Sequence, residues 1–311
     1  MSRENYSISG AVYVLAAIVS WGVYFPLAKI VLQKLSPEVF LVFRLGLGTV
    51  VLLGLYGWFG KSHQGKLQSL GKIILAGAIG VMLHQLIQTS GLKITSATNS
   101  GWIITLSPVF TGALGWIILK EKVRLRQMLG MGIALSGVLL LISKGKIWQL
   151  SFGRNLGDFL VLASAVTWSI YTVMNRPLLQ RNSAILVSAI QMGMGFLFFT
   201  ILAGTDILPQ SQALTTSDWM VLIIIGVIPS GLAYFWWNAG LARLTAVRTS
   251  IFLFIEAVIA SIMSVIILGE SFTILMLMAV IITIAGVTIA QTVSGYKSNS
   301  EVYNRSKSYE I

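Results

Sequence analysis

The sequence is poor in the residues that water-soluble proteins use at their surfaces and reactive sites. Only 10% of its 311 residues are charged, and it has no cysteine and 2 histidines. Soluble domains usually carry about 25% charged residues. The lack of cysteine excludes disulfides and thiolate metal sites. Because 56% of the residues are hydrophobic and the mean hydropathy is +0.84, the natural solvent of this chain is a lipid bilayer.

Acidic residues are the scarcer charged type, at 10 against 22 Lys and Arg, which gives a net charge of +12. In a soluble protein such an excess would favour nucleic-acid binding. Here the cations lie between apolar segments and form no extended basic face. We therefore predict no nucleic-acid partner and interpret the cations as signals of membrane topology.

Reactive motifs are missing as well. The run YGWFGKS at 56–62 ends like a phosphate-binding loop, but Leu55 stands where that motif needs glycine. The sequence has no H-E-x-x-H motif, and no two acidic residues lie deep together in the apolar regions. We predict that the protein is not an enzyme and that it has no cofactor and no metal site.

What remains is a series of apolar runs, each long enough to cross a bilayer as a helix. We predict an all-α integral membrane protein with ten transmembrane helices, because helices satisfy their own backbone groups in lipid. The first run is longer than the apolar part of a signal peptide, and no cleavage motif follows it, so we expect it to be retained. The expected helices are 10–32, 37–59, 70–90, 98–119, 126–143, 157–177, 184–204, 219–241, 247–268 and 271–293.

The two halves of the chain repeat each other. SWGVYFPLAK at 20–29 and TWSIYTVMNR at 167–176 share a tryptophan, a tyrosine and a final cation at an offset of 147 residues. GLKITSATNS at 91–100 and GLARLTAVRT at 240–249 match at an offset of 149. Five helices is an odd number, so we predict two inverted five-helix repeats. The aromatic pairs of SWGVYFPLAK and TWSIYTVMNR should then meet across a pseudo-twofold axis in the membrane plane. The predicted parts are a first repeat at 1–143, a connecting loop at 144–156, a second repeat at 157–293 and a disordered cytoplasmic tail at 294–311.

The distribution of cations predicts the orientation. If the N-terminus is cytoplasmic, 15 Lys and Arg lie in cytoplasmic segments and 6 in outer segments. Cytoplasmic loops of membrane proteins carry such an excess. We therefore predict a multi-pass protein of the inner (cytoplasmic) membrane of the cell, with both termini in the cytoplasm.

Together these motifs resemble the drug/metabolite transporter superfamily, EamA type. The resemblance rests on SWGVYFPLAK, on Pro37 and Arg44, on GLKITSATNSGWIITLSPVFTGALGWIILKEKV at 91–123, and on a second copy ending FIEAVIASIMSVIILGE. It covers nearly the whole chain except the tail. It departs at Ala257, where the family often has proline after the glutamate of the ninth helix. The resemblance implies movement of metabolites or drugs across a membrane, often export of amino acids or related compounds.

Two charged residues lie deep inside predicted helices. Glu256 is about 13 Å along its helix at about 1.5 Å per residue, where a charge costs at least about 2.5 kcal/mol. It either carries protons in a wet cavity or is a neutral glutamate hydrogen-bonded between helices. Arg44 is about 10 Å deep by the same rise. It could pair with Glu256, extend outward to the interface, or bind an anionic group of a substrate.

Uncharged polar and aromatic residues gather at similar depths. His84 and Gln88 share one helix face, and His84 either relays protons or serves as a satisfied donor between helices. The aromatic residues form either a cavity wall for a flat or cationic substrate or an interfacial belt. The predicted substrate cavity comprises Trp21, Tyr24, Arg44, His84, Gln88, Asn99, Trp102, Trp168, Tyr171, Tyr234, Trp237 and Asn238. Helix-interior prolines, the predicted gating residues, are Pro26, Pro108 and Pro229.

These features predict a secondary transporter, with Glu256 as the proton-coupling group and alternating access between the inverted repeats. Together with the resemblance, they lead us to expect export of small metabolites such as amino acids. Its expected partners are a small-molecule substrate, the lipid bilayer and protons. The alternative is a flippase for a lipid or lipid precursor on the same scaffold, with Arg44 as its anion site. A membrane subunit or receptor without transport is disfavoured, because it would not need a deep carboxylate or interrupted helices.

Overall fold

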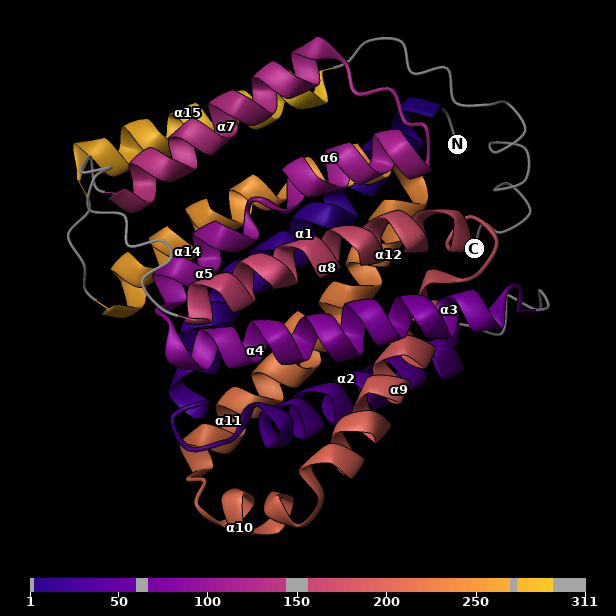
Figure 1. The fold of residues 1–311 in the computed structure, drawn as a ribbon, viewed down its shortest axis with the longest axis vertical. Helices are drawn as coiled ribbons and strands as arrows, with labels where there is room; N and C mark the ends of the chain where they lie inside the picture. The colour runs from indigo at the N-terminus through magenta and orange to yellow at the C-terminus, as the bar shows by residue number, and fades with distance from the viewer. Residues whose placement is uncertain (1–2, 60–66, 144–155, 269–272, 293–311) are drawn as a thin grey trace.

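The computed structural model describes residues 3–59, 67–143, 156–268 and 273–292, and every regular element in those ranges is a helix (Figure 1). The predicted tail at 294–311 and all but the last residue of the predicted loop at 144–156 lie outside the described residues.

All ten predicted membrane-spanning segments are present, which confirms the predicted fold class. Within the described ranges, nine spans are long and apolar enough to cross a membrane, and the fifth contributes a shorter apolar stretch, Leu125–Leu141. A short helix, α10 (Ile207–Gln212), follows the seventh span and is not among the predicted elements. The ten spans are α1 (Arg3–Val31), α2 (Pro37–Phe59), α3–η2–α4 (Leu70–Gly77, Ala78–Leu83, His84–Ile94), α5–α6 (Ala97–Ile104, Ser107–Ile118), α7 (Leu125–Ser143), α8 (Leu156–Leu178), α9 (Ala184–Ala203), α11–η5–α12 (Thr216–Ile225, Gly226–Leu232, Ala233–Arg243), α13–α14 (Ala246–Ile251, Leu253–Leu268) and α15 (Ile274–Gln291).

The second half of the bundle runs in the opposite direction to the first. Lys29, in the last turn of α1, donates from Nζ to the carbonyl of Thr95 at 2.6 Å. The Thr95 hydroxyl in turn donates to Asp158, in the first turn of α8, at 2.6 Å. The end of α1 and the start of α8 therefore lie on one side of the bundle. We call this the far side, and we call the opposite side, where α1 begins, the N-side.

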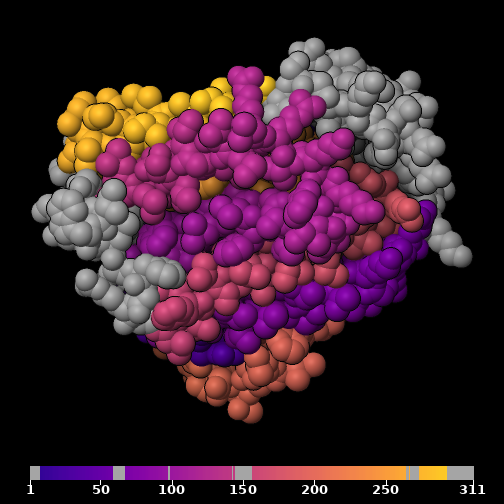
Figure 2. Space-filling view, turned by 45° about the horizontal axis from the view of Figure 1, so that its top comes forward, coloured from indigo at the N-terminus to yellow at the C-terminus, as the bar shows by residue number. Residues whose placement is uncertain are grey.

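Equivalent helices pack in equivalent ways around a pseudo-twofold axis. α1 packs against α12 as α8 packs against α4, while α2 pairs with α9 and α7 with α15. Figure 1 shows α7 and α15 lying side by side, and Figure 2 shows the yellow surface of α15 along one edge of the molecule. This arrangement places the first, third, sixth and eighth spans around the centre of the bundle.

Two of the central spans contain a π-helical segment at equivalent places, η2 in the third span and η5 in the eighth. Pro229 lies inside η5 and cannot donate a backbone hydrogen bond. The carbonyl of Ile225 instead accepts from the hydroxyl of the neighbouring Ser230, at 3.0 Å. This carbonyl therefore remains hydrogen-bonded inside the bundle. Pro26 lies inside α1, as predicted.

The fourth and ninth spans are broken. Thr105 and Leu106 separate α5 from α6, and Phe252 separates α13 from α14. This corrects the prediction for Pro108, which lies in the first turn of α6 and not inside a helix. At that position a missing N–H removes no helical hydrogen bond. The ninth span breaks without any proline, so the loss of proline at Ala257 leaves the break in place.

Candidate functional site

A cavity lies inside the bundle, with about 350 Å³ of empty space including its open mouth. Arg44 and Ile104 each lie seven residues from a helix start on the far side, whereas Trp21 and Trp168 lie in the middle of their spans. The cavity therefore occupies the middle and the far half of the bundle. Its lining residues are Trp21, Tyr24, Phe25, Arg44, His84, Gln85, Gln88, Ile104, Trp168, Tyr234, Leu253 and Glu256.

Arg44 is 2% exposed and is held by neutral partners from three other spans. Its Nε donates to the Ser230 hydroxyl at 2.8 Å, and its Nη1 donates to the Tyr24 hydroxyl at 2.8 Å and to Gln85 Oε1 at 2.9 Å. Gln85 Nε2 donates onward to the Tyr234 hydroxyl. These five residues are the Arg44 cluster. Since none of its partners is anionic, the cluster fixes the guanidinium group without neutralising it.

Glu256 lies in the first turn of α14, immediately after the break at Phe252, and is 3% exposed. Its carboxyl group lines the cavity and makes no hydrogen bond or ion pair with any residue that the structure describes. No Arg44 nitrogen lies within 4.0 Å of it, so the direct pair that the sequence left open is not formed. A buried carboxyl group without a partner is costly as an anion, which favours a ligand or a proton at this position.

The two equivalent tryptophans meet at the pseudo-twofold axis. The rings of Trp21 and Trp168 lie 5.2 Å apart, edge to face at 86°, as predicted for the repeated motif. Tyr234 lies 5.8 Å from each of them. The indole N–H of Trp21 donates to the carbonyl of Pro229 at 2.8 Å, so η5 and α1 hold each other in place. These rings form the aromatic wall of the cavity.

His84 and Gln88 both line the cavity, as expected for residues one turn apart. The His84 Nδ1 lies 2.9 Å from the carbonyl oxygen of Ser164. A carbonyl only accepts hydrogen bonds, so Nδ1 carries a proton and donates a hydrogen bond to Ser164 of α8. His84 thus acts as a donor between helices, and its ring also lines the cavity.

A second polar cluster, here called the sealed cluster, lies toward the N-side and is closed to solvent. The Tyr171 hydroxyl donates to Gln191 Oε1 at 3.1 Å and accepts from Asn238 Nδ2 at 3.2 Å. Asn238 also donates to the Ser188 hydroxyl at 2.8 Å, and Gln191 donates to Asn175 Oδ1 at 2.9 Å. None of these five residues is more than 1% exposed. The placement of Tyr171 and Asn238 in the cavity wall is therefore corrected, because both bond within this cluster.

Three further predicted residues do not line the cavity. Trp237 packs behind the wall, 5.3 Å from both Trp21 and Trp168. Asn99, near the start of α5, donates to Asp158 at 3.2 Å and is thereby held at the far-side end of the helix. Trp102 is buried but is not among the lining residues, and Ile104 of the same helix lines the cavity instead.

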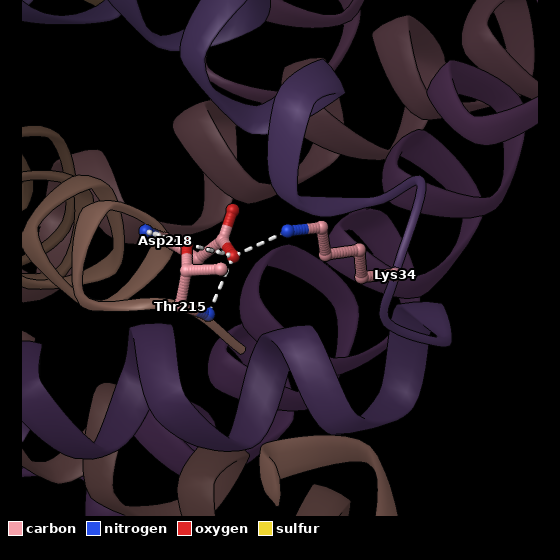
Figure 3. A network of polar contacts seen from close by, with 3 residues as sticks. All are labelled: Lys34, Thr215 and Asp218. Carbon is pink, nitrogen blue, oxygen red and sulfur yellow. Dashed lines mark hydrogen bonds and ion pairs between the residues drawn. The ribbon is translucent and has the colours of Figure 1, made fainter. Parts of the chain in front are cut away.

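An ion pair lies at the far-side end of the bundle, between the loop after the first span and the start of the eighth. Figure 3 shows Asp218 Oδ2 accepting from Lys34 Nζ at 2.6 Å and from both the backbone N–H and the hydroxyl of Thr215, at 2.7 and 2.6 Å. Thr215 caps α11, because its hydroxyl oxygen also accepts from the backbone N–H of Asp218, at 3.3 Å. The equivalent place on the N-side has an uncharged contact, in which Gln68 N–H donates to Asn182 Oδ1 at 2.8 Å.

Sequence reasoning missed Phe25, Gln85, Ile104 and Leu253 as lining residues. Gln85 is the informative omission, because it connects Arg44 to Tyr234. A regular helix would turn adjacent residues such as His84 and Gln85 by about 100° from each other. Both lie in α4, and both nevertheless line the cavity together with Gln88. The other three are apolar and carry no sequence signal that separates them from core residues.

Comparison with known proteins gives consistent matches over most of the chain. The model of the EamA-like transporter family matches residues 8–143 and, a second time, residues 155–292. A solved crystal structure superposes with a TM-score of 0.75 at 18% identity, covering 96% of this chain and 100% of that chain, which supports the fold alone.

Two curated relatives are similar over nearly their whole length. An uncharacterized transporter of Bacillus subtilis, YyaM, is 28% identical over 276 residues, covering 88% of this chain and 90% of that protein. A protein of Streptantibioticus cattleyicolor, named a probable terminal-alkyne amino-acid exporter, is 25% identical over 288 residues, covering 91% and 93%.

Proposed function

The chain belongs to the EamA-like transporter family, and we propose that it is a proton-coupled exporter of small metabolites such as amino acids, which works by alternating access. It is a multi-pass membrane protein and a transporter, not an enzyme. The observation that supports this proposal is that one cavity near the pseudo-twofold axis is lined by two buried charged groups, the carboxyl group of Glu256 and the guanidinium group of Arg44. Neither has a partner of opposite charge among the residues that the structure describes. The name of the Streptantibioticus relative supports export of amino acids as the class to test first.

The alternation rests on the two polar clusters. The sealed cluster closes the N-side, and the Arg44 cluster stands beside the cavity toward the far side. Because the repeats are inverted, exchanging the conformations of the two halves opens the N-side and closes the far side around the same centre. The interrupted third, fourth, eighth and ninth spans are the places where such a change is absorbed most easily.

In the proposed cycle, Glu256 takes up a proton while the cavity opens to the far side. After the switch, the proton leaves to the N-side and the substrate takes its place in the cavity. The return movement carries the substrate to the far side, so one proton enters for each substrate exported. With the N-side in the cytoplasm, as the cations predict, the inward proton gradient drives export.

The test uses the full chain in proteoliposomes, with amino-acid counterflow and ΔpH-driven transport measured on the same preparation. Glu256→Gln should retain counterflow and lose its response to ΔpH. The matched control is Ser107→Ala, since Ser107 is the equivalent of Glu256 in the first repeat and its hydroxyl donates only to the carbonyl of Ile104, at 2.6 Å. An unchanged ΔpH response in Glu256→Gln would remove this carboxyl group from the mechanism.

A further inference from the structure

The two tryptophans that meet at the pseudo-twofold axis differ in their hydrogen bonding, although they occupy equivalent places in the two repeats. The indole N–H of Trp21 donates to the carbonyl of Pro229 at 2.8 Å. The indole N–H of Trp168 has no acceptor in the described part of the chain, and the residue is only 4% exposed. A buried donor without an acceptor is costly. The present conformation therefore satisfies one indole and leaves the other unsatisfied.

The inverted repeat identifies the acceptor that Trp168 lacks. Pro229 lies in η5, and its equivalent in η2 is Gly80, because these two residues are 149 positions apart, as are the starts of α4 and α12. The π-helical segment η2 packs against α8, which carries Trp168, as η5 packs against α1, which carries Trp21. Symmetry therefore assigns the carbonyl of Gly80 to the indole of Trp168.

The ring of Tyr171 covers Gly80 in the present conformation. A Cβ at Gly80 would overlap this ring, so the close approach requires glycine. The hydroxyl of Tyr171 is held by Gln191 and Asn238 within the sealed cluster. Opening the sealed cluster would release the ring and uncover η2 at Gly80.

We propose that the indole N–H groups of Trp21 and Trp168 form their hydrogen bonds in turn, one in each conformation of the transport cycle. While the sealed cluster is closed, Trp21 bonds to Pro229. When the cluster opens, Trp168 bonds to Gly80 and Trp21 is released. The inference rests on the proposed alternating access and assigns two positioning residues to it. Each conformation then contains one bonded and one unbonded indole, so this contribution favours neither of them.

The contact between the two rings makes the exchange reciprocal. The rings of Trp21 and Trp168 lie 5.2 Å apart, edge to face at 86°. Because protein interiors are close-packed, one ring cannot turn toward its carbonyl without displacing the other. The two tryptophans thus connect η5 in the second repeat with η2 in the first.

The test observes the indole N–H groups directly, in the full chain purified in detergent and labelled with ¹⁵N-tryptophan. Each of the 9 tryptophans gives one indole N–H signal in a nuclear magnetic resonance spectrum, and single phenylalanine variants assign the two signals of interest. Trp21→Phe keeps an aromatic ring but removes the bond to Pro229. It should shift the population toward the open sealed cluster by about 2- to 10-fold, the range for one neutral hydrogen bond. The Trp168 signal should then move downfield, the direction that a hydrogen bond produces.

Trp168→Phe should act in the opposite direction. It removes a donor that the present conformation leaves unsatisfied, so it should stabilise this conformation and retain the bonded signal of Trp21. Trp237→Phe is the matched control. Its ring lies 5.3 Å from both tryptophans, and its indole N–H also has no acceptor among the described residues, but it has no part in the exchange. This variant should leave both signals in place.

A variant in η2 reaches the same conformation by another route. Gly80→Ala should displace the ring of Tyr171 and, like Trp21→Phe, move the Trp168 signal downfield. It replaces Trp21→Phe in the test if that variant does not fold. A Trp168 signal that stays in place, or signals of Trp21 and Trp168 that move in the same sense, would overturn the inference. Loss of folding in Trp168→Phe would overturn it as well, because that variant removes no bond from the present conformation.

Counterflow in proteoliposomes separates this inference from the function on which it rests. If a solute is transported while the Trp168 signal does not respond to Trp21→Phe or Gly80→Ala, the inference fails and the transport function stands. If the two signals respond reciprocally while no solute is transported, the proposed function fails and the exchange of hydrogen bonds stands.

Discussion

The Arg44 cluster and the sealed cluster occupy equivalent places in the two repeats, yet they differ in charge and in access. Tyr24 bonds to Arg44 in the first repeat as Tyr171 bonds to Gln191 in the second, each pair 147 residues from its counterpart. The first pair lies beside a cavity and carries a charge. The second is neutral and at most 1% exposed.

This difference shows how one scaffold can provide both a binding site and a closed gate. Neutral amides and hydroxyls in the sealed cluster satisfy one another, so the cluster needs neither solvent nor a ligand. Arg44 differs, because its partners in the described part of the chain leave Nη2 without a hydrogen bond and the positive charge unneutralised. The two repeats therefore share their helix packing, but the Arg44 cluster is charged and the sealed cluster is neutral.

The largest expected effect comes from giving the sealed cluster the charge of its counterpart. Gln191→Arg places a guanidinium group among neutral residues with no cavity beside it, and should destabilise the protein by about 2.5–3.5 kcal/mol. Unfolding in a denaturing detergent would measure this loss. Arg44→Gln, the reverse exchange, should cost less stability, because neutral residues already surround it. Equal losses in the two variants would show that the clusters do not differ as described.

A smaller loss of stability, equal for the two repeats, should follow substitutions in the contact between α7 and α15, where the two repeats are alike. A Cβ at Gly286 would lie 2.3 Å from the backbone nitrogen of Ala134, and a Cβ at Gly137 would lie 2.4 Å from the Thr283 hydroxyl. Each change to alanine should therefore disturb the α7–α15 contact and cost about 1–3 kcal/mol. Gly132→Ala is the control, since nothing lies within 4 Å of its Cβ. A large cost at one glycine and none at the other would contradict the symmetric packing.

Much of the fold could be predicted because its signals are local. Apolar runs of sufficient length indicate spans, and the repeated tryptophan at positions 21 and 168 correctly indicated a contact across the axis. The depth of Arg44 and Glu256 was also visible, since few charged residues lie so far from a helix end. These inferences needed only helix geometry and the cost of charge in lipid.

The rest depended on features that a sequence does not display. Tyr171 and Asn238 were assigned to the cavity, but the two repeats are equivalent, and nothing in the residues tells which side of the bundle is closed. Gln85 was missed because adjacent helical residues are turned about 100° from each other, and nothing in the residues tells that the cavity wall includes both His84 and Gln85. The break at Phe252 was missed for a related reason, since no proline or glycine marks it.

In the proposed cycle the cavity and the sealed cluster open in turn, each to its own side. The chain has no cysteine, so single cysteines can be introduced without removing others. Gln88→Cys would place a thiol in the cavity, and Ser188→Cys would place one in the sealed cluster. An impermeant maleimide applied to oriented proteoliposomes would report access to each thiol from each side, with and without substrate.

We predict that conditions in which Gln88→Cys reacts from the far side protect Ser188→Cys, and that substrate and low proton concentration on the N-side reverse this pattern. Reaction of both thiols in the same state, or a Ser188→Cys thiol that stays protected under every condition that supports transport, would contradict the account.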